Sequence, residues 1–165
     1  MKTKTAVFAS VLCFAGSIVC LANDANLGTW KLNEARSRLS PGAPKNQTVV
    51  YKAAGGNTKV TVDGTDADGK PTHNEWSGKF DGKDYPVTGD SNSDARAYKK
   101  IDDLNHANCA KLNFCTLEFT AKKDGKVTMS GHIIVSPDGK SRTVTMSGSD
   151  PNGNQINTTE LYDKQ

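Results

Sequence analysis

The sequence has few cysteines, few aromatic residues and little excess charge. Among its 165 residues 4 are cysteine, 7% are aromatic, and the formal net charge is +3. Basic residues are adjacent only at Lys99–Lys100 and Lys122–Lys123, and the lack of a basic stripe argues against binding to nucleic acid or to a membrane surface. The sequence also has no Cys-x-x-Cys motif, which argues against a redox centre or a zinc site of the usual spacing.

Long apolar runs are missing except at the start of the chain. Lys2 and Lys4 precede an uncharged, mostly apolar segment, Ala6–Leu21, and small residues at Cys20 and Ala22 fit a cleavage site. This pattern predicts a secretory signal peptide over residues 1–22 and a single mature domain over residues 23–165. An uncleaved membrane anchor is the alternative, but the apolar run is short for a span. A lipid anchor at Cys20 is disfavoured because bulky Val19 precedes it.

Two cysteines remain after the predicted cleavage. Cys109 and Cys115 have five residues between them, and in an oxidising compartment such a pair predicts a disulfide bond. The closed loop is small, so we expect the bond to hold residues 110–114 rigid and to add only about 2 kcal/mol to the stability of the fold.

Tight turns recur along the mature chain. The tripeptide Asp-Gly-Lys occurs at residues 68–70, 81–83, 124–126 and 138–140, and Asn152-Gly153-Asn154 resembles it. Asp-Gly and Asn-Gly pairs tolerate the positive φ that hairpin turns require. The turns therefore predict an antiparallel meander in which each strand pairs with the next.

Alternation of apolar and polar residues predicts about ten strands, each buried on one face. The predicted strands are 28–33, 47–54, 58–66, 72–80, 85–88, 95–101, 114–121, 127–135, 142–148 and 155–162, and one short helix is expected around residues 33–38. Adjacent hairpins favour an up-and-down barrel over a Greek-key sandwich, and closure removes exposed strand edges. The predicted fold class is all-β, an antiparallel up-and-down calycin-like barrel of about 8–10 strands.

Both ends of the mature chain carry a family resemblance. The first strand reads Gly28-Thr29-Trp30-Lys31-Leu32 and the last strand ends Leu161-Tyr162-Asp163-Lys164. These motifs resemble the calycins, namely the lipocalins and the intracellular fatty-acid-binding proteins. The resemblance implies a structural role for Trp30 as the plug of one barrel end, where a large rigid side chain excludes water.

The chain also looks like small exported bacterial proteins of lipocalin type, most of them without an assigned function. The shared features are the Gly-Thr-Trp start, the run Asp81–Gly89 and the turn Ser136–Lys140. This resemblance implies a periplasmic or secreted bacterial protein. One departure concerns the fatty-acid clamp of the cytosolic group: that group has an arginine two residues before its tyrosine, and this chain has Glu160 before Tyr162. The segment 34–45 is also too short and too rich in proline for the two-helix lid of that group.

The leading functional prediction is non-catalytic binding of a small, largely apolar ligand inside the barrel. Arg142 shares a strand face with Met146, and a lone inward arginine would attract an anion. The alternative for the aromatic residues is that they only fill a narrow barrel. The predicted ligand-binding residues are Trp76, Phe80, Tyr85, Tyr98, Met129, Arg142, Met146 and Tyr162.

Metal binding and catalysis find little support in the sequence, and no cofactor is expected. The three histidines, His73, His106 and His132, are scattered, and the pair His73-x-Glu75 lacks a third ligand. No nucleophile motif such as Gly-x-Ser-x-Gly occurs, although an inward Glu or His with a strongly shifted pKa would favour an enzyme. The other alternative is an envelope interaction protein with a packed barrel and a partner site on the loops 89–94 and 109–115.

Overall fold

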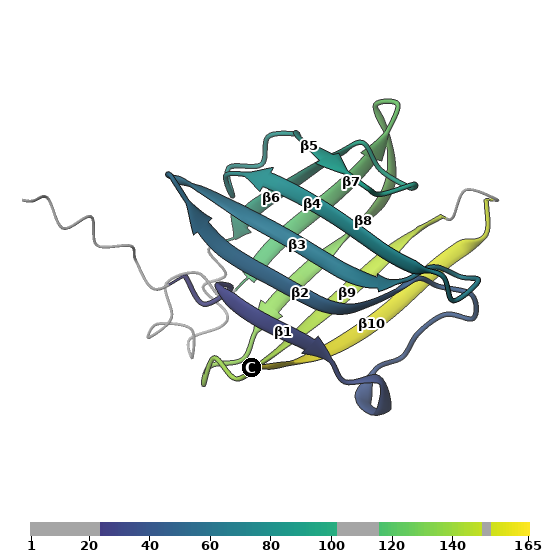
Figure 1. The fold of residues 1–165 in the computed structure, drawn as a ribbon, viewed down its shortest axis with the longest axis horizontal. Coiled ribbons are helices and arrows are strands. Elements are labelled where there is room, and N and C mark those ends of the chain that lie inside the picture. The colour runs from purple at the N-terminus through teal and green to yellow at the C-terminus, as the bar shows by residue number, and fades with distance from the viewer. Residues whose placement is uncertain (1–23, 102–115, 150–152) are drawn as a thin grey trace, which may run out of the picture.

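The computed structural model describes residues 24–101, 116–149 and 153–165. The predicted signal peptide, the predicted Cys109–Cys115 disulfide bond and His106 lie outside these residues. Within them the chain forms ten strands and one short 3₁₀ helix (Figure 1). The strands are β1 (Gly28–Leu32), β2 (Lys45–Ala54), β3 (Asn57–Thr65), β4 (Pro71–Gly78), β5 (Tyr85–Thr88), β6 (Ala95–Ile101), β7 (Thr116–Lys123), β8 (Lys126–Val135), β9 (Ser141–Ser149) and β10 (Gln155–Lys164).

The strands close into a barrel in which every strand pairs antiparallel with its neighbour in sequence. Closure comes from β1, which pairs with β2 on one side and with β10 on the other. At the β1–β10 seam Trp30 lies opposite Lys164 and Leu32 lies opposite Tyr162. The predicted all-β fold class, an antiparallel up-and-down barrel, is therefore confirmed with ten strands.

Glycine supplies the hairpin turns, as the repeated motif predicts. The glycines of the five predicted turns, residues 69, 82, 125, 139 and 153, have φ between 69° and 85°. This left-handed region is open to glycine but strained for residues with a Cβ. The turns leave β3–β4, β7–β8, β8–β9 and β9–β10 as adjacent hairpins, while Gly82 turns the longer connection between β4 and β5.

The short helix predicted around residues 33–38 is reduced to one 3₁₀ turn, η1 (Glu34–Arg36). Asn33 makes no side-chain capping bond to it, and Arg38 already pairs with Thr159 of β10 through two backbone hydrogen bonds. The segment thus follows the edge of the sheet instead of extending a helix. It leads into Gly42–Pro44, at the end of the barrel where the cavity opens.

The core fills one end of the barrel. Trp30 is fully buried, and its indole N–H donates to the carbonyl of Asn26 at 2.8 Å. Trp76, Leu117 and Tyr162 are each at most 1% exposed. This packing leaves the opposite end of the barrel less filled, and the role of Trp30 as a plug stays a prediction.

Candidate functional site

The barrel encloses a cavity of about 570 Å³. Its rim is formed by the segment before β2, the β3–β4 turn and the β5–β6 loop, all at the same end of the barrel. Below the rim the wall carries apolar side chains from strands all around the barrel: Val49, Val62, Phe119, Ala121, Met129, Ile133, Val144, Met146 and Ile156. A cavity of this size lies in the range of small-molecule sites, about 300–1,000 Å³.

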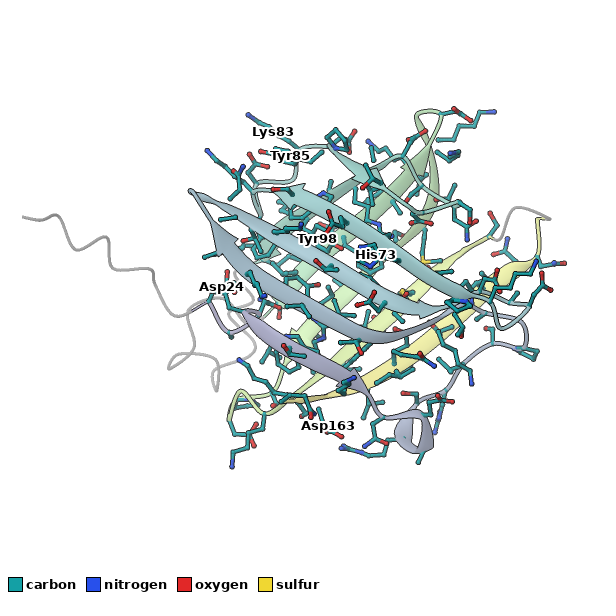
Figure 2. The ribbon with its side chains drawn as sticks, in the orientation of Figure 1. Asp24, His73, Lys83, Tyr85, Tyr98 and Asp163 are labelled. Atoms are coloured by element: carbon teal, nitrogen blue, oxygen red, sulfur yellow. The ribbon has the colours of Figure 1, made fainter. Side chains whose placement is uncertain are left out.

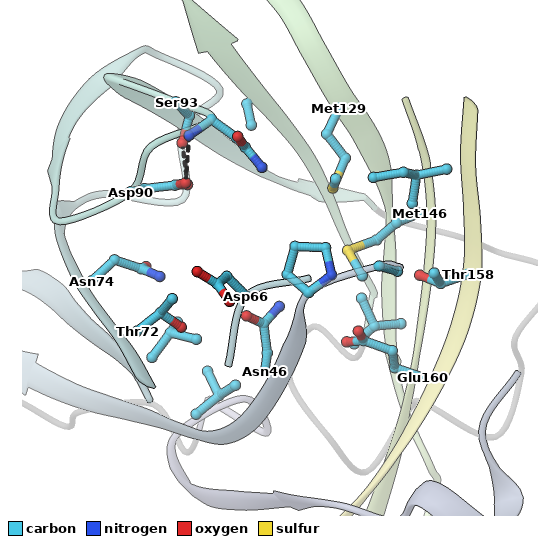
Figure 3. Close-up of a pocket in the computed structure, with 18 of the residues that line it drawn as sticks. Asn46, Asp66, Thr72, Asn74, Asp90, Ser93, Met129, Met146, Thr158 and Glu160 are labelled. Carbon is cyan, nitrogen blue, oxygen red and sulfur yellow. Dashed lines mark hydrogen bonds between the residues drawn. The ribbon is translucent and has the colours of Figure 1, made fainter. Parts of the chain in front are cut away.

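One side of the rim is held by a polar cluster in the β5–β6 loop (Figure 3). The Ser93 hydroxyl donates to Oδ2 of Asp90 at 2.5 Å, and the Arg96 guanidinium pairs with the same oxygen. Burial alone would raise the pKa of Asp90, but the charge of Arg96 and the hydrogen bonds from Ser93, Asn92 and Arg96 together outweigh burial, and the pKa of this carboxyl is lowered. Ionised Asp90 thus fastens the loop to β6. The sequence offered this loop as a partner site of an envelope interaction protein and did not indicate the polar cluster.

Arg142 on β9 lies at the deep end of the cavity. Its side chain is buried, and its guanidinium carbon stands 4.9 Å from the ring centre of Trp30, 5.0 Å from that of Tyr51 and 4.6 Å from that of Tyr162. Three aromatic faces thus surround the cation, which is a favourable environment for it. Within the described residues, Nε and Nη1 of Arg142 have no hydrogen-bond partner. Both atoms are also buried away from solvent.

Glu160 on β10 lies beside Arg142 and is only 1% exposed. Its Oε2 accepts a hydrogen bond from the Tyr162 hydroxyl at 2.5 Å, while Oε1 has no partner among the described residues. Burial raises the pKa of Glu160 to about 7, against the opposing effects of the Tyr162 hydrogen bond and the Arg142 charge. Burial also raises the pKa of Tyr162, so its hydroxyl stays protonated. Glu160 therefore changes charge near neutral pH.

Sequence reasoning left Glu160 out of the predicted ligand-binding residues, although a signal for it was present. Residues 156, 158, 160 and 162 stand at every second position of the last strand, and all four are buried. This period of two places Glu160 inward together with Tyr162. The sequence singled out Glu160 only as a departure from the fatty-acid clamp.

The structure brings five of the eight predicted ligand-binding residues together along the cavity and leaves three outside it. Those that line it are Tyr98, Met129, Arg142, Met146 and Tyr162. The other three, Trp76, Phe80 and Tyr85, do not line it. Whether any of the eight contacts a ligand stays a prediction.

Those three aromatic residues form a cluster of their own that packs against Tyr98. The rings of Trp76 and Phe80 stack at 6.1 Å, and Tyr85 and Tyr98 meet Trp76 edge-on at 5.7 and 4.8 Å. Figure 2 places Tyr98 within the barrel and Tyr85 toward its end. Of these four aromatic residues, Tyr98 lines the cavity, and the other three fill a separate part of the barrel.

The pair His73 and Glu75 lies on the outer face of β4. His73 contacts Asp63 at 2.7 Å and Glu75 at 3.7 Å, and Glu75 pairs with Lys59 at 2.7 Å. The hydrogen bond that the His73 ring donates to Asp63 raises the pKa of His73. His132 on β8 is exposed as well. No group of three metal-ligating side chains occurs in the part of the chain that the structure describes.

Comparison with known proteins adds little to this geometry. No protein-family model matches the chain, and no curated protein matches it. Among solved structures it is similar to "Structure of a redesigned beta barrel, mFAP1, bound to DFHBI", with a TM-score of 0.44 and 17% sequence identity over 87% of this chain and 98% of the other. Across residues 24–101, 116–149 and 153–165, no helix has the length and apolar character needed to cross a membrane.

Proposed function

We propose that this protein is exported and binds a small, largely apolar ligand inside its barrel without chemically changing it. The observation that carries the proposal is the 570 Å³ cavity, which combines an apolar wall with the buried guanidinium of Arg142 at its deep end. A barrel packed solid with side chains would have excluded this function. The alternative, an envelope interaction protein, assumed such a packed barrel.

The wall and the deep end supply different parts of the binding free energy. Burying an apolar ligand against the wall contributes about 25 cal/mol for each Å² removed from water. The N–H groups of Arg142 lost their water on folding, so a ligand acceptor that meets them restores hydrogen bonds that the folded protein lacks. Apolar contact thus gives affinity, and Arg142 fixes which end of the ligand enters first.

A dye-binding experiment on protein purified without detergent tests the proposal. A neutral hydrophobic dye, N-phenyl-1-naphthylamine, is expected to bind with one site per chain, and native mass spectrometry is expected to show a co-purified small molecule or one bound dye. A matched pair of variants on β9 locates the site. Met146→Trp places an indole into the cavity and should abolish dye binding, whereas Thr145→Trp adds the same group at an exposed position and should leave binding unchanged. Equal dye binding by both variants would overturn the proposal.

A second candidate function is an enzyme that moves a proton, because Glu160 meets the criterion set from the sequence. An inward carboxyl whose pKa is about 7 is suited to general acid–base catalysis near neutral pH. Arg142 beside it could stabilise negative charge that develops on a carbonyl oxygen. The test is exchange of a carbon-bound hydrogen of the co-purified ligand in D₂O. Exchange that the native protein catalyses and Glu160→Gln does not would establish the enzyme and displace the binding proposal.

A further inference from the structure

The deep end of the cavity holds three buried polar side chains whose hydrogen-bonding capacity is incomplete. Nε and Nη1 of Arg142, Oε1 of Glu160 and Oγ1 of Thr158 have no hydrogen-bond partner among the residues that the structure describes. All three side chains are at least 95% buried and line the cavity. Figure 3 shows Thr158 and Glu160 on one side of the cavity, next to Met146. Buried polar atoms in native proteins are nearly always paired, so three such residues at one spot indicate a ligand.

Strand register places Arg142 and Glu160 within reach of one small head group. Arg142 lies directly opposite Tyr162 across the β9–β10 pair, and Glu160 lies opposite Val144. Arg142 and Glu160 are therefore diagonal neighbours, for which the expected separation is about 7–8 Å. Thr158 follows two residues further along β10, opposite Met146. Because Oε1 of Glu160 and Nε and Nη1 of Arg142 are all without partners, these atoms do not satisfy one another.

The chemistry of the two residues is complementary. An arginine can only donate hydrogen bonds, and an ionised carboxylate can only accept them. Tyr162 already occupies Oε2 of Glu160, so Oε1 is the acceptor left for a ligand. A head group that satisfies both residues must carry an acceptor for Arg142 and an N–H or O–H donor for Glu160. A carboxylate has no donor, and the charge of Glu160 repels it.

We propose that the deep end of the cavity selects ligands with a neutral head group that carries both an acceptor and a donor, of which a carboxamide is the simplest case, attached to an apolar body. This inference rests on the proposed binding function and specifies its ligand class. Fatty acids, which the calycin resemblance brings to mind, are disfavoured as ligands above neutral pH.

Three probes with the same eight-carbon body separate the head groups. Octanamide has an acceptor and a donor, methyl octanoate has acceptors only, and octanoate has acceptors and a negative charge. Each is titrated against protein loaded with N-phenyl-1-naphthylamine at about pH 8, where Glu160 is mostly ionised because its pKa is about 7. We expect octanamide to displace the dye about tenfold or more better than either other probe, because a site built to accept a hydrogen bond rejects analogues without the donor.

The variant Glu160→Gln changes the acceptor into a group that can donate. Its side-chain oxygen can keep the Tyr162 hydrogen bond, which leaves the NH₂ facing the ligand. The preference for octanamide over methyl octanoate is expected to disappear, and octanoate is expected to bind more tightly than it does to the native protein. Glu118→Gln on the exposed face of β7 makes the same chemical change away from the cavity. It should retain the native preference.

The outcomes distinguish the two proposals. If the three probes displace the dye equally from the native protein, or if Glu160→Gln keeps the octanamide preference, the ligand class is wrong while binding itself stands. If the dye binds outside the cavity, as judged by Met146→Trp, the proposed function fails first and this inference fails with it.

Discussion

Replacing Glu160 with glutamine should make the protein more stable at alkaline pH. The pKa of Glu160 is raised by burial from its usual 4.5 to about 7 in the folded protein. The folded state therefore favours the protonated carboxyl. The stability that the protonated Glu160 carboxyl contributes to the folded state is fully present below about pH 4.5. It falls as the pH rises toward 7 and is lost above that pH. The gap between the two pKa values means that the contribution of Glu160 to the free energy of unfolding falls by about 3 kcal/mol from pH 4 to pH 8.

Glutamine at this position is neutral at every pH and can still accept the Tyr162 hydrogen bond. The free energy of unfolding of Glu160→Gln, relative to that of the native protein, is therefore expected to rise by about 3 kcal/mol from pH 4 to pH 8. The two tyrosines beside Arg142 stay protonated throughout this interval, because the pKa values of Tyr51 and Tyr162 are both raised above the usual tyrosine value. The free energy difference between variant and native protein thus isolates Glu160.

The assay is urea unfolding at a series of pH values, followed by the fluorescence of the buried Trp30 and Trp76. Glu118→Gln serves as the control because its side chain is exposed, and its stability should follow the native curve. Parallel pH curves for Glu160→Gln and the native protein would refute the reasoning. That result would mean that water or an unaccounted partner solvates the buried carboxylate.

Three further predictions concern the ligand, the core and the cysteines. Octanoate should bind more tightly at about pH 5.5 than at about pH 8 by dye displacement, because protonation of Glu160 removes the repelling charge while most octanoate remains ionised; equal affinity would contradict this. Leu117→Ala should lower the free energy of unfolding by about 2–5 kcal/mol because Leu117 is fully buried, whereas Val127→Ala, at a 58% exposed position, should change it by less than about 0.5 kcal/mol. Mature exported protein should show no thiol to a labelling reagent under denaturing conditions, and two reactive thiols would disprove the predicted Cys109–Cys115 bond.

The barrel was predictable from sequence because the patterns that specify its turns and strands are local. Each Asp-Gly pair specifies a turn over a few residues, and the alternation of apolar residues specifies which face of a strand is buried. Asn74, Trp76 and Gly78 of β4 share the buried face, as the alternation predicts. Short-range patterns of this kind are complete within one hairpin, so a meander can be assembled from them one strand at a time.

The site was less predictable because it depends on depth along the barrel and on register between strands. Alternation assigns Trp76 and Met146 alike to the interior, yet Trp76 packs within the aromatic cluster and Met146 lines the cavity. Arg142 and Glu160 become diagonal neighbours because the β9–β10 register brings Arg142 opposite Tyr162. That pairing depends on the two strands and their turn together, and the pattern of either strand alone does not contain it.

The β1–β10 seam has a consequence for the order in which the barrel can form. The first strand of the barrel is completed only by the last, through pairs such as Leu32 with Tyr162 and through the hydrogen bond from the Gln165 amide to the Thr29 carbonyl. Contacts that span so much of the chain form late and slowly. The barrel therefore cannot close until β10 is present to pair with β1. Since β10 also brings Glu160 and Tyr162, closure of the wall and assembly of the deep end of the cavity are one event, and a chain that stops short of β10 has neither.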